Sequence, residues 1–434
     1  MDNALDPQTR ENILNAQTVR GIPPTQALVP YANIGALLDE RASHQPDRVF
    51  LIHYDEQGER RTYTYGEFNR RVNQMANFLR EELGLRPGER VATIAHNHPD
   101  VLLITFAAWR LGAAVAPQNL AEDDQRIAYI LRDSQSRFVF AQAEHLARAE
   151  RIVAEAPDVR EMVPLGGSAS GRHIHFGETV ARHPPTWRDT APPERSAECV
   201  LVYTSGTTGA PKGVVLTQYN LMVNADAMAR WDGIAADDRL MCVLPIHHVN
   251  GLVVTHMAPL VAGASVVLNP QFTAHHFWKR LADERVTISS VVPTILQFLV
   301  EADEDIRAYD LSRLRFLICG AGTLSVALAQ RFEARFGVRI VHGYGLSETT
   351  AYACHLSVGL SAEEYRHWMT DFGYPSIGCP FDVNEMAIFD AAGEGRELAE
   401  GERGEIAIRG HSVMKHYFQR PDANRETFRY GWFR

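Results

Sequence analysis

The sequence lacks the marks of disulfide-rich, zinc-binding and secreted proteins. Its five cysteines are odd in number, widely spaced and mostly set in apolar runs, without a CxxC pair: Cys199, Cys242, Cys319, Cys354 and Cys379. The N-terminus, MDNALDPQTREN, is polar and acidic where a secretory signal would be basic and then apolar. We therefore expect reduced, mostly buried thiols and a cytoplasmic protein.

Long apolar runs and an excess of positive charge are also missing. The longest apolar stretch, GLVVTHMAPLVAGASVVL, is interrupted by His256 and Pro259, which favours a buried helix followed by a strand over a membrane span. Forty-three basic against fifty-three acidic residues give a net charge of -10, which repels a phosphate backbone outside any local basic pocket. We expect neither a nucleic acid partner nor a membrane span.

What the chain does contain is an alternation of strands and helices. Its 434 residues are too many for one ordinary hydrophobic core, so two or three modules are expected. Thr64 and Glu67 form a capping box at the start of an amphipathic helix that Gly84 ends. The strand-like run VATIA, a helical stretch over 100–111 and the apolar run AAVAP follow. A strand, helix and strand in this order predict a parallel sheet.

The alternation of strands and helices is interrupted once and gives way to short β segments near the end. Residues 166–195 are rich in Gly, Ser, Pro and Thr, which is typical of an exposed linker. Buried strands then resume with LMCVL, ASVVL, TISSVV, RFLIC and VRIVHG, and a helix is expected over 325–336. After about Phe381 only short β segments, EMAIF and GEIAIRG, remain.

These patterns predict an α/β fold of two packed α/β subdomains with largely parallel sheets, followed by a small β subdomain. We place the first subdomain, with its N-terminal extension, at 1–195, the second at 196–372 and the small β subdomain at 373–434.

One loop has a composition suited to phosphate. YTSGTTGAPKGV (203–214) holds four Ser or Thr hydroxyls, three glycines and a lysine, between an apolar strand and a helical run that begins at Thr217. Unpaired N–H groups and hydroxyls at such a place can surround phosphate oxygens, and a lysine can neutralise them. Pro211 precedes Lys212 and Gly213 follows it, so the spacing is not that of a P-loop ATPase.

YTSGTTGAPKG resembles the signature of the acyl-adenylate-forming enzymes, the superfamily of acyl-CoA synthetases, nonribosomal peptide adenylation domains and firefly luciferase. Six further motifs agree in order over nearly the whole chain: LPIHHVNGL, CGAGTLS, HGYGLSETT, GYPSIG, GERGEIAIRG and YGWFR. The resemblance implies that a carboxylate attacks the α-phosphate of ATP, with Mg²⁺, to give acyl-AMP and pyrophosphate. An ionised carboxylate needs no general base, so positioning and charge neutralisation should carry catalysis.

The resemblance also implies roles for individual residues. The phosphate cradle would be Thr204, Ser205, Gly206, Thr207, Thr208, Gly209 and Lys212. Glu348 would hold Mg²⁺, and Ser347, where relatives often have threonine, would contact the phosphate. Tyr344 would stack on adenine, and the nucleotide slot would be lined by Gly320, Ala321, Gly322, Gly343 and Gly345. The catalytic set implied is Lys212, His248, Ser347 and Glu348.

The acid is the next question. His248 matches the residue that borders the carboxylate pocket in relatives, whereas His247 is read as structural. Adenylation domains for free amino acids carry an aspartate where this chain has Val249, because a buried ammonium needs a paired charge. We therefore expect an apolar acid, aryl or aliphatic, bound by His248, Val249, Gly251, Leu252, Gly320 and Gly343.

CoA is the first choice of acyl acceptor, because LPIHHVNGL and VVPTILQFL look most like the acyl-CoA ligase branch. A stand-alone enzyme that passes the acyl group to an amine or a carrier protein would share every motif, and a non-catalytic nucleotide-binding protein is a further alternative. The histidine pairs 173/175 and 275/276 have no third ligand at fitting spacing, so neither predicts a metal.

Relatives continue past the match to YGWFR into an aspartate that binds the ribose and a small C-terminal domain whose lysine contacts the α-phosphate. The sequence stops at Arg434. We expect these residues to be the large N-terminal portion of a longer enzyme.

Overall fold

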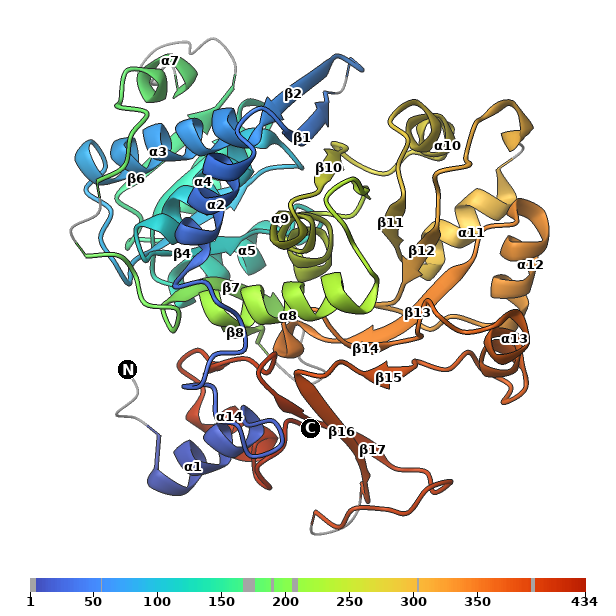
Figure 1. Cartoon of the computed structure of the whole chain (residues 1–434). Coiled ribbons are helices and arrows are strands. Elements are labelled where there is room, and N and C mark those ends of the chain that lie inside the picture. Colours follow the sequence, from blue (N-terminus) through green and yellow to red (C-terminus); the bar gives the residue numbers. More distant parts are fainter. Residues whose placement is uncertain are drawn as a thin grey trace.

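The computed structural model describes residues 5–55, 57–166, 176–188, 191–204, 210–302, 304–391 and 395–434. Two large sheets carry the fold of these residues (Figure 1). The α-helices follow one another in the order α1(Pro7–Ala16), α2(Ile34–His44), α3(Tyr65–Glu81), α4(Pro99–Arg110), α5(Asp124–Asp133), α6(Leu146–Val153), α7(Phe176–Ala181), α8(Gln218–Trp231), α9(Ala258–Ala262), α10(Ala274–Asp283), α11(Pro293–Glu301), α12(Val326–Phe336), α13(Ala362–Thr370) and α14(Pro421–Thr427).

The nine-stranded sheet runs in the order β15(Cys379–Pro380), β14(Tyr352–His355), β13(Ile340–Gly345), β12(Phe316–Cys319), β11(Ile288–Val291), β9(Arg239–Cys242), β10(Ser265–Leu268), β1(Val49–Tyr54) and β2(Arg60–Thr64). Neighbours from β13 to β1 are parallel, and antiparallel strands flank them at both ends. The parallel strands β9 to β12 are almost wholly buried, as expected where helices cover both faces.

The seven-stranded sheet runs in the order β18(His416–Tyr417), β8(Lys212–Thr217), β7(Glu198–Thr204), β4(Ala114–Pro117), β3(Arg90–Ile94), β5(Ser136–Gln142) and β6(Glu161–Leu165). The strands from β7 to β6 are parallel, and β8 and β18 are antiparallel. The predicted α/β class with largely parallel sheets is confirmed.

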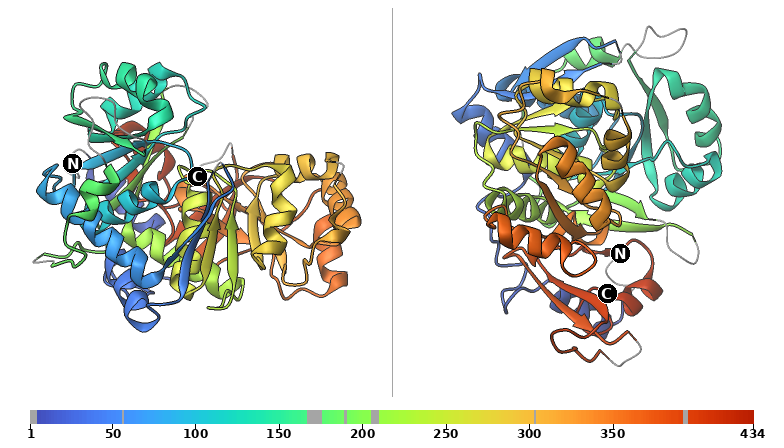
Figure 2. Two further views of the ribbon diagram at one scale, coloured as in Figure 1. Left: turned by 90° about the horizontal axis from the view of Figure 1, so that it is seen from above. Right: turned by 90° about the vertical axis from the view of Figure 1, so that its right-hand side faces the viewer.

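The two sheets exchange strands across residue 195. β1 and β2 precede that residue yet belong to the nine-stranded sheet, and β7 and β8 follow it yet belong to the seven-stranded sheet. Figure 2 shows the elements around β3 to β6 and those around β11 to β13 as two units side by side. The subdomain boundaries themselves stay predictions.

The predicted helix after Thr64 is α3. The Thr64 hydroxyl accepts the N–H of Glu67 at 3.1 Å, which caps the first turn. Its apolar face, Phe68, Val72, Met75 and Leu79, is fully or almost fully buried. Each such side chain contributes about 1.5–3 kcal/mol on leaving water. The helix ends at Glu81, three residues before Gly84.

Of two other predicted stretches, the first is confirmed and the second differs from expectation. The GLVVTHM run forms a buried π-helical segment, η3(Asn250–Met257), then α9 and β10, which confirms the buried helix and strand. The linker after residue 166 is not simply exposed. Asn73 and Asn77 of α3 donate to the carbonyls of Pro185 and Pro184 at 3.0 and 2.9 Å, so that part of it packs onto the first unit.

The strands of the C-terminal region belong to three different sheets. β16(Asn384–Phe389) and β17(Glu405–Gly410) form a separate hairpin, whereas β15 and β18 extend the two large sheets. α14 lies beside α1 (Figure 1), where Asn12 donates to the Arg429 carbonyl at 3.0 Å.

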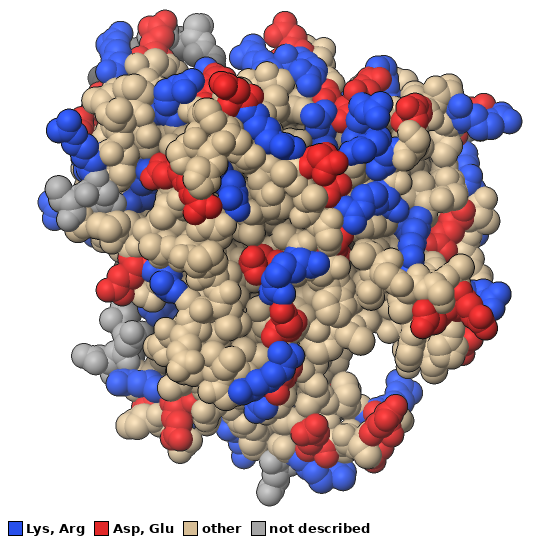
Figure 3. All heavy atoms as spheres, in the orientation of Figure 1, with Lys and Arg blue, Asp and Glu red and all other residues tan. Residues whose placement is uncertain are grey.

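Four of the five cysteines are buried, Cys379 is exposed, and all five are free thiols. Within the described ranges, no helix combines the length and the apolar character that crossing a bilayer requires. On the face seen in Figure 3, basic and acidic side chains are interspersed rather than gathered by sign.

Candidate active site

The predicted phosphate loop connects two antiparallel strands. Thr204 ends β7 and pairs with Lys212, which begins β8. Our placement of the loop between a strand and a helix was therefore wrong. The strand β8 follows the loop, and Thr217, the last residue of β8, caps the N-terminus of α8. Ser205, Gly206, Thr207, Thr208 and Gly209 lie outside the described residues. The hairpin sets the half-buried Thr204 and Lys212 side by side without help from a helix N-terminus.

Glu348 lies in a short turn, η5(Ser347–Thr349), between β13 and β14. It is 8% exposed, and its Oε1 accepts the hydroxyl of Tyr417 at 2.8 Å. Among the described residues no ion pair compensates this carboxylate. A nearly buried, unpaired carboxylate is costly, and carboxylate oxygen is the ligand that Mg²⁺ prefers. Glu348 therefore fits a magnesium ligand.

Tyr417 joins Glu348 to Lys212. The Lys212 ammonium lies 4.5 Å from the centroid of the Tyr417 ring, within cation–π range. Tyr417 reaches this place because β18 pairs with β8, with Tyr417 opposite Val214. Burial, and then the charge and hydrogen bond of Glu348, raise the pKa of Tyr417, so its phenol stays a donor at neutral pH.

Tyr417 was not predicted from the sequence. It lies outside every motif quoted above and 69 residues after Glu348, so only the fold brings the two together. The same segment also holds the η5 turn through its backbone, because the Met414 N–H donates to the Glu348 carbonyl at 2.7 Å.

The glycines at the ends of β12 and β13 are required by close packing. A Cβ on Gly320 would lie 2.6 Å from the Tyr352 hydroxyl and 2.8 Å from the Gly343 carbonyl. A Cβ on Gly345 would lie 1.8 Å from the Ala351 carbonyl. Ala321 and Gly322, in contrast, are exposed just beyond β12, and Ala321 has a φ of 57°, a left-handed conformation that costs a non-glycine residue energy.

A cavity of about 460 Å³ lies beside the ends of β12 and β13. It brings together five residues that the sequence singled out, namely His248, Val249, Ala321, Gly345 and Ser347. It adds seven that the sequence analysis did not assign, namely Leu244, Pro245, Asn250, Val292, Leu346, Ala351 and Tyr352. Five of these seven carry aliphatic or proline side chains, so the wall is mainly apolar.

Several expected contacts lie elsewhere. Of the described residues, Gly251, Leu252, Gly320 and Gly343 are not in the wall of this cavity. A Cβ on Gly251 would meet the Pro245 carbonyl at 2.4 Å, and Leu252 is 4% exposed within the core. Tyr344, half-buried on β13, is also outside the wall.

The cavity has a fixed polar corner. Ser290 donates to Asn250 Oδ1 at 2.7 Å, and Asn250 Nδ2 lies 3.4 Å from the hydroxyl of the buried Tyr352. Asn250 adjoins the LPIHHV run, and a polar side chain opening an apolar helix is the signal that could have marked it.

His248 borders the cavity, and the surrounding protein lowers its pKa through desolvation. Its imidazole is therefore neutral at neutral pH and can bind a carboxylate only by donating a hydrogen bond. The ring of His247 packs 4.3 Å away, and desolvation lowers the pKa of His247 to about 3. The rings of His275 and His276 lie 4.9 Å apart in a tilted arrangement, while His173 and His175 lie outside the described residues.

Two sheets that meet at a lysine, a buried carboxylate and an apolar cavity suit an enzyme that joins an acid to a nucleotide. A family profile described as "AMP-binding enzyme" matches residues 38–418, and the chain belongs to this family.

Three similar proteins indicate which type of enzyme within this family the chain resembles. The sulfoacetate–CoA ligase of Cupriavidus necator is 32% identical over 406 residues, which are 93% of this chain and 75% of that protein. The feruloyl-CoA synthase of an Amycolatopsis species is 33% identical over 370 residues, 85% and 69% of the two chains. The crystal structure of the anthranilate CoA ligase AuaEII in complex with anthranoyl-AMP superposes with a TM-score of 0.84 at 25% identity, over 94% of this chain and 75% of that one. The chain is thus an AMP-forming ligase of the acid–CoA type.

Proposed function

We propose that this protein activates an apolar carboxylic acid, aryl or aliphatic, with ATP and transfers the acyl group to CoA. A carboxylate oxygen forms a bond to the α-phosphorus of ATP while the bond to the β-phosphate bridge breaks, and pyrophosphate leaves. The CoA sulfur, after losing its proton, then attacks the acyl carbon, and AMP leaves with that carboxylate oxygen.

The observation that carries the proposal is the cavity between His248 and Ser347. Among the described residues of its wall, none has a formally charged side chain. A sulfonate or a free ammonium buried there would lack a partner, which costs several kcal/mol. An aryl or alkyl group would lose only its water, which is favourable. The volume, about 460 Å³, is within the range of small-ligand pockets.

The acids named for the relatives differ too much to identify the substrate of this chain. Sulfoacetate is small and doubly charged, whereas ferulate and anthranilate carry aromatic rings. The apolar wall, with Val249 and Val292 in it, favours the second kind.

The polar residues then have distinct tasks. Lys212 neutralises phosphate oxygens, Ser347 donates to one of them, and neutral His248 orients the acid. Glu348 would hold Mg²⁺, which supplies positive charge to the phosphates when bound. Tyr417 orients Glu348 through their hydrogen bond.

The test is acid-dependent exchange of labelled pyrophosphate into ATP by the full-length protein, with mass spectrometry of CoA thioesters in parallel. The panel contains benzoates, cinnamates, fatty acids, sulfoacetate and α-amino acids. We expect exchange and thioester with aryl or aliphatic acids. Activity with sulfoacetate or amino acids alone would contradict the proposal, and exchange without thioester would point to an amine or carrier-protein acceptor.

Val249 offers a matched pair of variants for this test. Val249→Leu keeps the wall apolar and should retain the apolar acids. Val249→Asp buries a charge there and should lower kcat/KM for them by about 100-fold, equivalent to about 2.7 kcal/mol. Equal losses in both variants would remove Val249 from the acid site.

A further inference from the structure

His96, Glu144 and His145 meet at one edge of the seven-stranded sheet. β3 ends at Ile94 and β5 ends at Gln142, and the two strands are parallel neighbours. Residues just past their carboxyl ends therefore share the edge where open α/β sheets bind ligands. The backbone N–H of His96 donates to Gln142 Oε1 at 2.6 Å, which fixes the two strand ends to each other.

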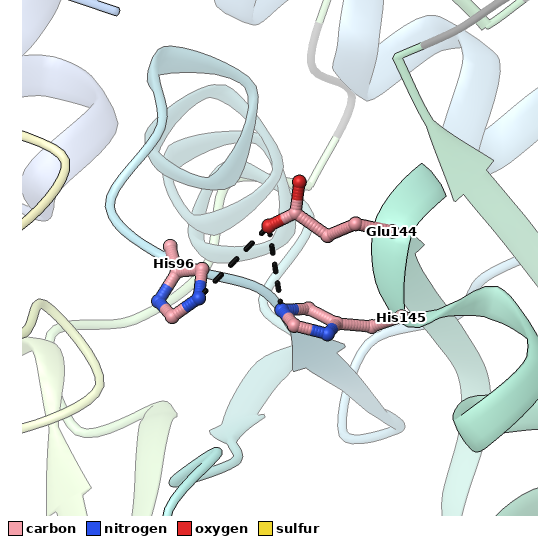
Figure 4. Close-up of side chains that lie close together, drawn as sticks. All are labelled: His96, Glu144 and His145. Atoms are coloured by element: carbon pink, nitrogen blue, oxygen red, sulfur yellow. Dashed lines mark ion pairs between the residues drawn. The ribbon is translucent and has the colours of Figure 1, made fainter. Parts of the chain in front are cut away.

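The three side chains converge on one point, as Figure 4 shows. Glu144 Oε1 lies 3.4 Å from His145 Nε2 and 3.9 Å from His96 Nε2. One ligand atom from each residue lies within 4.8 Å of the other two. Zinc bonds of about 2.0–2.1 Å in tetrahedral geometry place ligand atoms about 3.3 Å apart. The separations of 3.4 and 3.9 Å found here are close to that value.

The surroundings admit a cation. His96, Glu144 and His145 are 40%, 48% and 20% exposed at their side chains, so an ion can reach them from solvent. A cavity of about 460 Å³ adjoins His96 and Glu144. Its wall holds three carboxylates, Asp55, Asp100 and Glu144, against the two guanidinium groups of Arg61 and Arg71.

We propose that His96, Glu144 and His145 bind one borderline divalent metal ion such as Zn²⁺, with water at the remaining position. Two imidazoles and one carboxylate suit Zn²⁺ or Co²⁺, whereas Mg²⁺ prefers oxygen ligands in octahedral geometry. The site is thus distinct in chemistry from the Mg²⁺ site expected at Glu348. Asn97 directly follows His96 in the sequence. Its side chain donates to the Leu244 carbonyl at 3.0 Å and accepts the Ile246 N–H at 2.8 Å.

The experiment measures metal binding rather than activity, so its outcome is independent of the proposed ligase reaction. The chain is treated with chelator, exchanged into metal-free buffer and titrated with Co²⁺, whose visible absorption reports coordination by nitrogen and oxygen. We expect one equivalent of Co²⁺ per chain, displaced by Zn²⁺, and a melting temperature that rises with Zn²⁺.

Three variants remove one ligand each: His96→Ala, His145→Ala and Glu144→Gln. Changing a residue behind a metal ligand costs about 10- to 100-fold in affinity, so losing a ligand should weaken Co²⁺ binding by more than about tenfold. His275→Ala is the matched control, since it removes one of two neighbouring exposed histidines elsewhere on the surface. Glu144→Gln keeps size and polarity, which protects the test against a variant that fails to fold.

Parent-like Co²⁺ affinity in all three variants would overturn the proposal. So would an equal loss in His275→Ala, or the absence of stoichiometric binding by the parent chain.

Discussion

Tyr417→Phe tests the arrangement of the nucleotide site with a single atom. The phenol donates to Glu348 Oε1 at 2.8 Å, and the ring lies 4.5 Å from the Lys212 ammonium. Phenylalanine keeps the ring in place against the lysine and removes only the hydroxyl. The change therefore separates the orientation of Glu348 from the packing of Lys212.

The expected magnitude follows from the burial of Glu348. A hydrogen bond to a charged group contributes about 1.5–3 kcal/mol, and Glu348 is 8% exposed, so water replaces the lost donor poorly. If Glu348 binds Mg²⁺, its misorientation should raise the Mg²⁺ concentration for half-maximal activity and lower kcat/KM for ATP. Partners behind metal ligands are worth about 10- to 100-fold, and we expect a loss in that range.

The assay is pyrophosphate exchange over a series of Mg²⁺ concentrations. Tyr54→Phe is the control, because Tyr54 also donates to a carboxylate, that of Glu284 at 2.6 Å, at a place distant in sequence from the motifs. A Mg²⁺ dependence in Tyr417→Phe equal to that of Tyr54→Phe would refute the positioning role. Tyr417→Leu, which also removes the ring, should lose more than Tyr417→Phe.

Three further perturbations have definite expectations. Lys212→Ala should lower kcat/KM for ATP by about 100-fold, since it removes a charge-assisted phosphate contact, whereas Lys279→Ala removes only an exposed ion pair with little effect; equal kinetics would exclude Lys212 from the site. Gly345→Ala should abolish nucleotide binding in equilibrium dialysis, because its Cβ would lie 1.8 Å from a backbone carbonyl, while Gly359→Ala, with only a serine hydroxyl at 3.6 Å, should bind normally. Burial lowers the pKa of His256 from 6.5 to about 4, so the unfolded chain binds the extra proton and stability falls as pH drops from about 6.5 to 4. Urea unfolding of His256→Asn should show a pH slope reduced by about 1.4 kcal/mol per unit there, and an unchanged slope would contradict this.

The elements of the parallel sheets were predictable from the sequence because a strand buried on both faces is a continuous apolar run. LMCVL and RFLIC became β9 and β12 in this way. Their grouping was not predictable by the same reasoning. β1 joins β10 across more than two hundred residues, and no local pattern encodes such a pairing.

The phosphate hairpin shows the same limit at the site. Lys212 and Gly213 open β8 with residues of low strand propensity, so the run resembled a loop leading into a helix. Pairing with β7 on one side and β18 on the other makes it a strand. The roles proposed for Lys212 and Glu348 follow from family resemblance, whereas the contact of Tyr417 with both residues could be found only from the fold.

The central claim is that the acid is activated by attack of its carboxylate on the α-phosphate. It is tested most directly with an apolar acid whose carboxylate carries heavy oxygen, incubated with the full-length protein, ATP, Mg²⁺ and CoA. Mass spectrometry of the AMP formed should show one labelled oxygen, because the acyl–oxygen bond breaks when the sulfur attacks the acyl carbon. Label in ADP, inorganic phosphate or pyrophosphate, with unlabelled AMP, would contradict the account.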